Sequence, residues 1–141
     1  MVLVDANVLL YGVNRNVPQH ERAKRWIEET LSGSESVGFA WMVLLAFVRI
    51  ATLPALHPHP LSCAQAFDVL DGWLEAGPAT MVQPTSRHAG VLRGLLEESG
   101  SAGNLVADAH LAALALEHGA RLCTFDRDFA RFPGLKAFAP A

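Results

Sequence analysis

Apolar residues along this chain alternate between strand-like and helix-like spacing. Short, continuous apolar runs predict buried strands at residues 2–4, 36–39, 80–83, 121–125 and 136–138. Apolar positions that recur every three or four residues predict helices at 6–12, 19–32, 41–52, 62–75, 86–98 and 104–118, with a short helical turn from Asp126. Strands that alternate with connections of this length are typical of a parallel sheet with helices on both faces. The pattern therefore predicts an α/β fold, a three-layer α/β/α sandwich, with loops at the proline-rich segment 53–61 and at 99–103.

Length and composition limit the class of protein. The 141 residues suit one domain spanning 1–141, and 51% apolar with 18% charged residues argues against a disordered chain. The longest apolar run, from Phe39 to Val48, is ten residues, about half of what a membrane helix needs. No signal-peptide pattern opens the chain, and its two cysteines do not make a disulfide framework. We therefore expect a cytoplasmic protein without membrane association.

Two polar clusters directly follow predicted strands. Asp5 and Asn7 follow the first strand, and Asp126 and Asp128 follow the fourth. Ligands of open α/β sheets bind beyond the carboxyl ends of the strands, which is where these clusters are expected. The alternative interpretation is helix capping, because Asp and Asn are favoured at the first position of a helix.

A further acidic residue, Asp108, interrupts an apolar stripe of the predicted helix 104–118. The other members of this stripe are Leu105, Ala109, Ala112 and Leu116. A lone buried carboxylate costs several kcal/mol unless it is paired or binds a metal. Asn104 precedes Asp108 by one turn on the same face and is placed to orient it. The alternative is a buried carboxylate satisfied by backbone amides or an arginine.

Carboxylates and asparagines without a Cys/His set form an all-oxygen site. Such a site suits Mg²⁺, with Mn²⁺ as the alternative, rather than zinc. The chemistry that this predicts is metal-assisted hydrolysis of a phosphodiester bond, in which the ion activates water and offsets the charge that develops on the phosphate.

Four segments of the chain resemble the PIN-domain ribonucleases, in particular the VapC-type toxins of bacterial toxin–antitoxin pairs. They are VDANVLLY at 4–11, FVRIAT at 47–52, GNLVADAHLAALALEHGA at 103–120 and TFDRDFARFPGL at 124–135, in the family's order and over essentially the whole chain. The resemblance implies a strand order of 3-2-1-4-5, which places the ends of strands one and four side by side. It also implies a Mg²⁺-dependent endoribonuclease that cleaves structured RNA such as tRNA or rRNA, inhibits translation and growth, usually forms a homodimer, and is neutralised by a VapB-type antitoxin.

The resemblance assigns roles to the acids by motif position. It implies that Asp5, Asp108 and Asp126 bind the metal, that Asn7 and Asn104 support them, and that Asp128 is an adjacent catalytic acid. One position departs from the family, which usually has a glutamate on the third helix where this chain has Ala46. Because alanine cannot bind a metal, either Asp128 supplies the missing charge or the site holds one ion until RNA phosphates complete a second.

Several cations are candidates for contacts with the acids or with RNA. Arg49, the only charged residue of its predicted helix, lies one turn after Ala46, and we expect it to pair with a site acid, with a phosphate clamp as the alternative. His110 lies about 200° around its helix from Asp108, so we predict a surface or rim position on the side that carries Glu117. An RNA contact is the alternative for His110. Two arginines, Arg87 and Arg127, are candidate phosphate contacts or simply solvated charges.

Two other functions remain open at this point. A haloacid-dehalogenase-like phosphatase also has acids after its first strand, but that chemistry needs a second Asp at the position of Asn7 and a mid-chain lysine that this sequence lacks. A PIN module that binds RNA or a partner without cleaving is the stronger alternative, because of Ala46. The net charge of −3 does not oppose RNA binding, since assigning four acids to the site leaves eleven basic against ten acidic groups.

Overall fold

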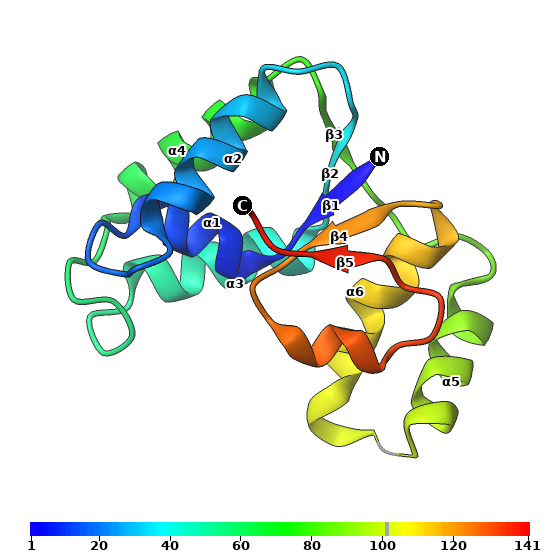
Figure 1. The fold of residues 1–141 in the computed structure, drawn as a ribbon. Coiled ribbons are helices and arrows are strands. Elements are labelled where there is room, and N and C mark those ends of the chain that lie inside the picture. The colour runs from blue at the N-terminus through cyan, green and yellow to red at the C-terminus, as the bar shows by residue number, and fades with distance from the viewer. Residues whose placement is uncertain (101) are drawn as a thin grey trace.

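The centre of the molecule is a five-stranded, fully parallel sheet. The structure is a computed structural model that describes residues 1–100 and 102–141 (Figure 1). The strands are β1 Val2–Val4, β2 Val37–Phe39, β3 Ala79–Met81, β4 Arg121–Cys123 and β5 Ala137–Phe138. Their order is β3-β2-β1-β4-β5, as the resemblance implied. The register pairs Val4 with Cys123, so the carboxyl ends of β1 and β4 lie side by side.

Helices cover the two faces of this sheet. They are α1 Ala6–Val13, α2 His20–Leu31, α3 Trp41–Thr52, α4 Cys63–Glu75, α5 His88–Ser99 and α6 Val106–Glu117, with the 3₁₀ turns η1 Gly103–Leu105 and η2 Arg127–Arg131. Figure 1 shows α1 to α4 gathered on one side of the strands and α5 and α6 on the other. The predicted three-layer α/β/α architecture is therefore confirmed.

Most predicted elements are present, with shifted ends. The helix predicted at 104–118 is two elements, because the chain first makes the 3₁₀ turn η1 after Gly103, whose φ is +60°. The strand predicted at 121–125 ends at Cys123, because the backbone N–H of Phe125 donates to the side chain of Asn7 instead of to a neighbouring strand. Of the turn predicted at 99–103, residue 101 lies outside the described residues, and Gly100 ends α5 with a left-handed φ of +69°.

The core holds the site-bearing strand rigidly. Val2, Leu3 and Val4 of β1 are at most 1% exposed, so this strand is buried on both faces. On the far side of α3, Phe47 packs edge-on against Trp73 of α4, with 4.8 Å between the ring centroids. Among the described residues, no helix has the length and hydropathy that a membrane span requires.

Candidate active site

Asp5 stands at the junction of β1 and α1 with both carboxylate oxygens engaged. It is the N-cap of α1, and its Oδ1 accepts a 2.7 Å hydrogen bond from the backbone N–H of Ala6. Its Oδ2 accepts from the hydroxyl of Thr124 at 2.7 Å and from Nδ2 of Asn7 at 3.1 Å. The capping interpretation is therefore correct for Asp5, but the same side chain also bonds to Thr124 at the end of β4.

Thr124 connects the two polar clusters that follow β1 and β4. It is 4% exposed, and besides donating to Asp5 its hydroxyl accepts from the backbone N–H of Asp126 at 3.0 Å and from Asn7 at 3.2 Å. Sequence reasoning missed this residue. In the sequence, Thr124 could have been identified as a hydroxyl residue between a buried strand and an acidic cluster, at the start of TFDRD, residues 124–128.

Asp126 and Asp128 lie at the start of η2, just beyond β4. Asp126 is the N-cap of η2, and its Oδ1 accepts from the backbone N–H of Asp128 at 2.9 Å. Asp128 is exposed, with Arg131 Nη2 3.9 Å from its Oδ1. Both acids therefore follow the strand as predicted, with Asp128 at the rim.

Neighbouring acids affect the pKa values of Asp5 and Asp108. Burial raises the pKa of Asp5 above its usual range, hydrogen bonds from Thr124 and Ala6 oppose this, and the carboxylates of Asp108 and Asp126 raise it further. Asp108, half-buried in the first turn of α6, has its pKa raised by burial and by Asp126, with Arg131 acting in the opposite direction. We call Asp5, Asp108, Asp126 and Asp128 the acid cluster.

The chemistry of the acid cluster fits a hard divalent cation. Its available ligands are carboxylate oxygens. A cation would stabilise the ionised carboxylates of Asp5 and Asp108, whose pKa values are raised first by burial and then by the neighbouring acids. Within the described residues, no three His, Cys, Asp or Glu side chains are already arranged as a complete ligand set. Mg²⁺ does not require one, because it usually binds one or two carboxylates and keeps several waters.

The predicted supporting residues are only partly in place. Asn7 is, since it bonds to Asp5, Thr124 and Phe125. Asn104 is exposed on η1 and makes no hydrogen bond to Asp108 in the described part of the chain. The expected pairing of Arg49 with a site acid is wrong. Arg49 is exposed on α3 and belongs to none of the ion pairs among residues 1–100 and 102–141, which leaves the phosphate contact as a prediction.

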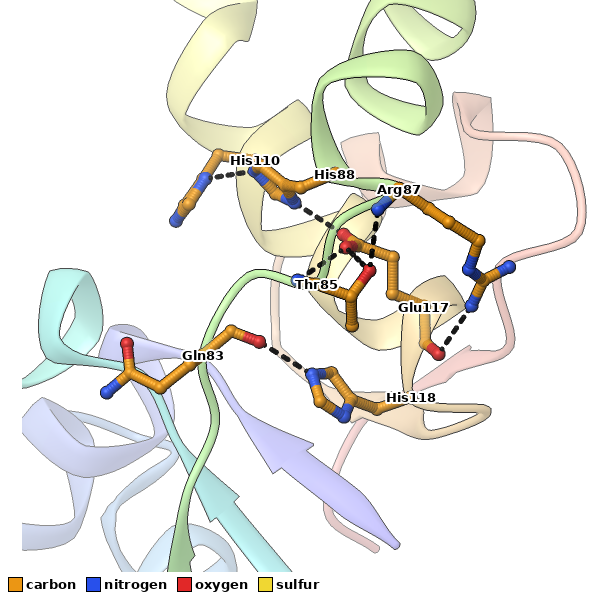
Figure 2. Close-up of polar contacts among 7 residues, drawn as sticks. All are labelled: Gln83, Thr85, Arg87, His88, His110, Glu117 and His118. Carbon is orange, nitrogen blue, oxygen red and sulfur yellow. Dashed lines mark hydrogen bonds and ion pairs between the residues drawn. The ribbon is translucent and has the colours of Figure 1, made fainter.

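His110 belongs to a separate cluster between α5 and α6, which Figure 2 shows. The side chain of Glu117 is fully buried, and its Oε1 accepts from the backbone N–H and the hydroxyl of Thr85 at 3.0 and 2.6 Å. Its Oε2 is paired with His88 Nδ1, and His88 Nε2 lies 2.8 Å from His110 Nδ1. We call Thr85, His88, His110 and Glu117 the Glu117 cluster.

The Glu117 cluster corrects the prediction for this side of α6. His110 is half-buried at the edge, which is the rim position predicted for it, but this side of α6 is not a solvated face, because α5 packs against it and Glu117 is buried. Burial and the neighbouring His88 lower the pKa of His110, with Glu117 opposing them. Arg87 is exposed but donates from Nη2 to the backbone oxygen of Glu117 at 2.9 Å, whereas Arg127 is exposed next to the acid cluster. RNA contacts by Arg87, Arg127 and His110 stay predictions.

Comparisons with known proteins agree with the fold. The model of the PIN domain family matches residues 2–135. The chain is 50% identical to Ribonuclease VapC37 of Mycobacterium tuberculosis over 96% of this chain and 94% of the relative, and 37% identical to Ribonuclease VapC33 of the same organism over 96% and 95%. Among solved structures, VapBC2 from Rickettsia felis bound to a promoter DNA fragment is similar in fold, with a TM-score of 0.71 at 19% identity over 100% of both chains. The chain therefore belongs to the PIN domain family and, within it, to the group of the VapC ribonucleases.

Proposed function

We propose that this protein is a Mg²⁺-dependent endoribonuclease toxin of a type II toxin–antitoxin system, with Mn²⁺ as an alternative ion. The observation that carries the proposal is the acid cluster beside the paired ends of β1 and β4. The carboxylate of Asp5 accepts from the hydroxyl of Thr124, and the same hydroxyl accepts from the backbone N–H of Asp126. Asp108, from α6, is close enough to contribute to the raised pKa of Asp5. The chain's 50% identity to a protein named as a ribonuclease supports RNA as the substrate. We propose structured RNA, tRNA or rRNA, and activity in the bacterial cytoplasm, where those RNAs function.

The residues of the acid cluster have distinct tasks in this proposal. Asp5, Asp108 and Asp126 would hold the ion, which when bound supplies activation of water and neutralisation of charge on the phosphate. Thr124 and Asn7 hold the carboxylate of Asp5 in one orientation through bonds of 2.7 and 3.1 Å, so it needs no rearrangement during the reaction. Asp128 adds negative charge at the exposed rim. Among the described residues, the partner of its carboxylate is Arg131, at 3.9 Å.

The direct test is cleavage of RNA by the purified protein. We expect total RNA to be cut with Mg²⁺ or Mn²⁺, and to stay intact with EDTA or with the Asp5→Asn variant. Asp71→Asn is the matched control, because Asp71 is an exposed carboxylate on α4, outside the acid cluster. Mapping the cut ends identifies the RNA. Cleavage that continues unchanged in Asp5→Asn would contradict the assignment of the site.

We propose a VapB-type antitoxin as the partner, with the toxin forming a homodimer. Support comes from solved structures of similar fold, which include VapBC from Salmonella typhimurium bound to DNA, with a TM-score of 0.67 at 20% identity. Expression of the toxin alone should arrest bacterial growth, and co-expression of the small gene next to it should restore growth. Light scattering of the purified protein measures its oligomeric state.

A PIN module that binds RNA without cutting it is the second candidate, and Ala46 favours it. Ala46 is half-buried on α3 at the position where the family usually has an acid. The two candidates differ in one measurement, because a binding module retains RNA in a mobility-shift assay but gives no metal-dependent products. A variant that restores the acid, Ala46→Glu, would then gain cleavage only if the missing carboxylate is the limiting defect.

A further inference from the structure

A pocket of about 670 Å³ opens directly beside the acid cluster. Its lining includes Thr124 and Asp126 after β4, and Gln19 and Arg22 at the start of α2. Arg127 and Phe138 also contribute to the lining. The volume lies within the range of about 300–1,000 Å³ that small ligands occupy in proteins. The pocket therefore has room for part of a nucleotide, and one of its walls is shared with the acid cluster.

Arg22 is held in a fixed orientation at this pocket. Its Nε and Nη2 both donate to the backbone oxygen of Pro140, at 3.0 and 2.6 Å, and its guanidinium lies 5.2 Å from the centroid of the Phe125 ring. These contacts leave Nη1 without a protein acceptor among the described residues. A planar guanidinium with a fixed edge loses little entropy when it binds an oxyanion.

Arg127 supplies a second cation at the same pocket. It directly follows Asp126 at the start of η2 and is exposed. In the part of the chain that the structure describes, neither Arg22 nor Arg127 forms an ion pair with a carboxylate. Two guanidiniums without a carboxylate partner therefore lie beside the acid cluster. They attract a phosphate to a place next to the carboxylates, which on their own would repel it.

We propose that this pocket, between Arg22 and Arg127, binds the RNA phosphate that neighbours the one being hydrolysed. The inference rests on the proposed function, because it names where the substrate's backbone lies relative to the acid cluster. Contacts with phosphate oxygens position nucleic acid without reading its sequence. The pocket thereby sets which phosphate of the chain reaches Asp5 and Asp126, and it supplies the positive charge that the overall composition lacks.

The test is RNA binding measured apart from cleavage. A short fluorescein-labelled RNA hairpin is titrated with protein in EDTA, with fluorescence anisotropy as the readout, at several salt concentrations. Arg127→Gln should weaken binding about 10–150-fold, since a charge-assisted hydrogen bond contributes about 1.5–3 kcal/mol. It should also lower the slope of log Kd against log salt by about 1. Arg25→Gln is the matched control, because Arg25 is exposed on α2 but does not line the pocket.

The second variant, Arg22→Gln, tests the side of the pocket that α2 provides. It loses the two bonds to Pro140, so its thermal unfolding is measured first, and Arg127→Gln carries the test if the first variant is unstable. Unchanged affinity and salt slope in Arg127→Gln overturn the inference, even if the wild type cleaves RNA. Conversely, Arg-dependent binding by a wild type that never cleaves would overturn the proposed function and leave the binding pocket standing.

Discussion

Replacing Glu117 with alanine removes the buried acceptor on which three donors of the partly buried Thr85 and His88 depend. The backbone N–H and hydroxyl of Thr85 and the Nδ1 of His88 all bond to its carboxylate, which has no exposed surface. Although burial raises the pKa of Glu117, the hydrogen bonds from Thr85 and His88 outweigh it and leave the pKa below its usual range. Deleting one partner of a buried charged contact costs about 3–5 kcal/mol, and we expect Glu117→Ala to fall in this range.

Glu117→Gln separates the charge from the hydrogen bonds. The amide oxygen can still accept from Thr85, and the amide nitrogen can donate to His88 once that ring takes its other tautomer. Neutral hydrogen bonds contribute about 1 kcal/mol each where charged ones contribute about 1.5–3, so we expect a loss of only about 1–2 kcal/mol. The order of stability is therefore wild type, then Gln, then Ala.

Urea unfolding followed by circular dichroism measures these differences. For a chain of 141 residues, the loss expected for Glu117→Ala corresponds to a melting temperature about 10–17 °C lower. Glu29→Ala is the control, because Glu29 is exposed on α2 and should change stability by less than about 0.5 kcal/mol. The reasoning is refuted if Glu117→Ala costs less than about 1 kcal/mol, or if Glu117→Gln costs as much as Glu117→Ala.

Three further predictions concern the acid cluster and the sheet. Thr124→Val keeps the shape but removes the hydroxyl bond to Asp5, so metal affinity measured by calorimetry should fall about 10–100-fold, with Thr124→Ser restoring most of it. The folded-state pKa of Asp108 is raised, so its ionised form destabilises the metal-free fold at neutral pH. Asp108→Asn should therefore melt at a higher temperature than the wild type at pH 7, but not near pH 3. Equal melting temperatures of the two proteins at both pH values would contradict this. Gly38→Ala should cost about 1–3 kcal/mol in urea unfolding, because its Cβ would lie 2.6 Å from a valine methyl, whereas Gly94→Ala on α5 meets nothing within 4 Å and should stabilise by about 0.5–1 kcal/mol.

The positions of the individual acids could be predicted from local rules. Asp5 and Asp126 each follow a short buried strand, and Asp108 interrupts an apolar stripe. Their convergence could not be derived in this way, because it requires β1 and β4 to be neighbours, and strand order depends on contacts between distant segments. The resemblance to a family supplied that order, and the structure confirms it.

Helical periodicity could not predict the Glu117 cluster. Residues on nearly every side of α6 are buried, among them Leu111, Ala113 and Leu114, so apolar spacing does not identify one core-facing side. A polar residue on such a helix is expected at the surface until the packing of α5 is known. Arg49 shows the converse, since a lone charge on an apolar helix suggested a buried ion pair, but Arg49 lies on the exposed side of α3.

The bond between Thr124 and Asp5 joins residues 119 positions apart. A chain emerging from the ribosome carries Asp5 without the hydroxyl that orients it until the following 119 residues have been added. Until then β1 also lacks β4, one of its two sheet neighbours. Contacts of such long sequence separation are the ones that wait for the intervening chain. A nascent chain that has not yet reached Thr124 therefore has no acid cluster, and under the proposed function such a chain cannot cleave RNA.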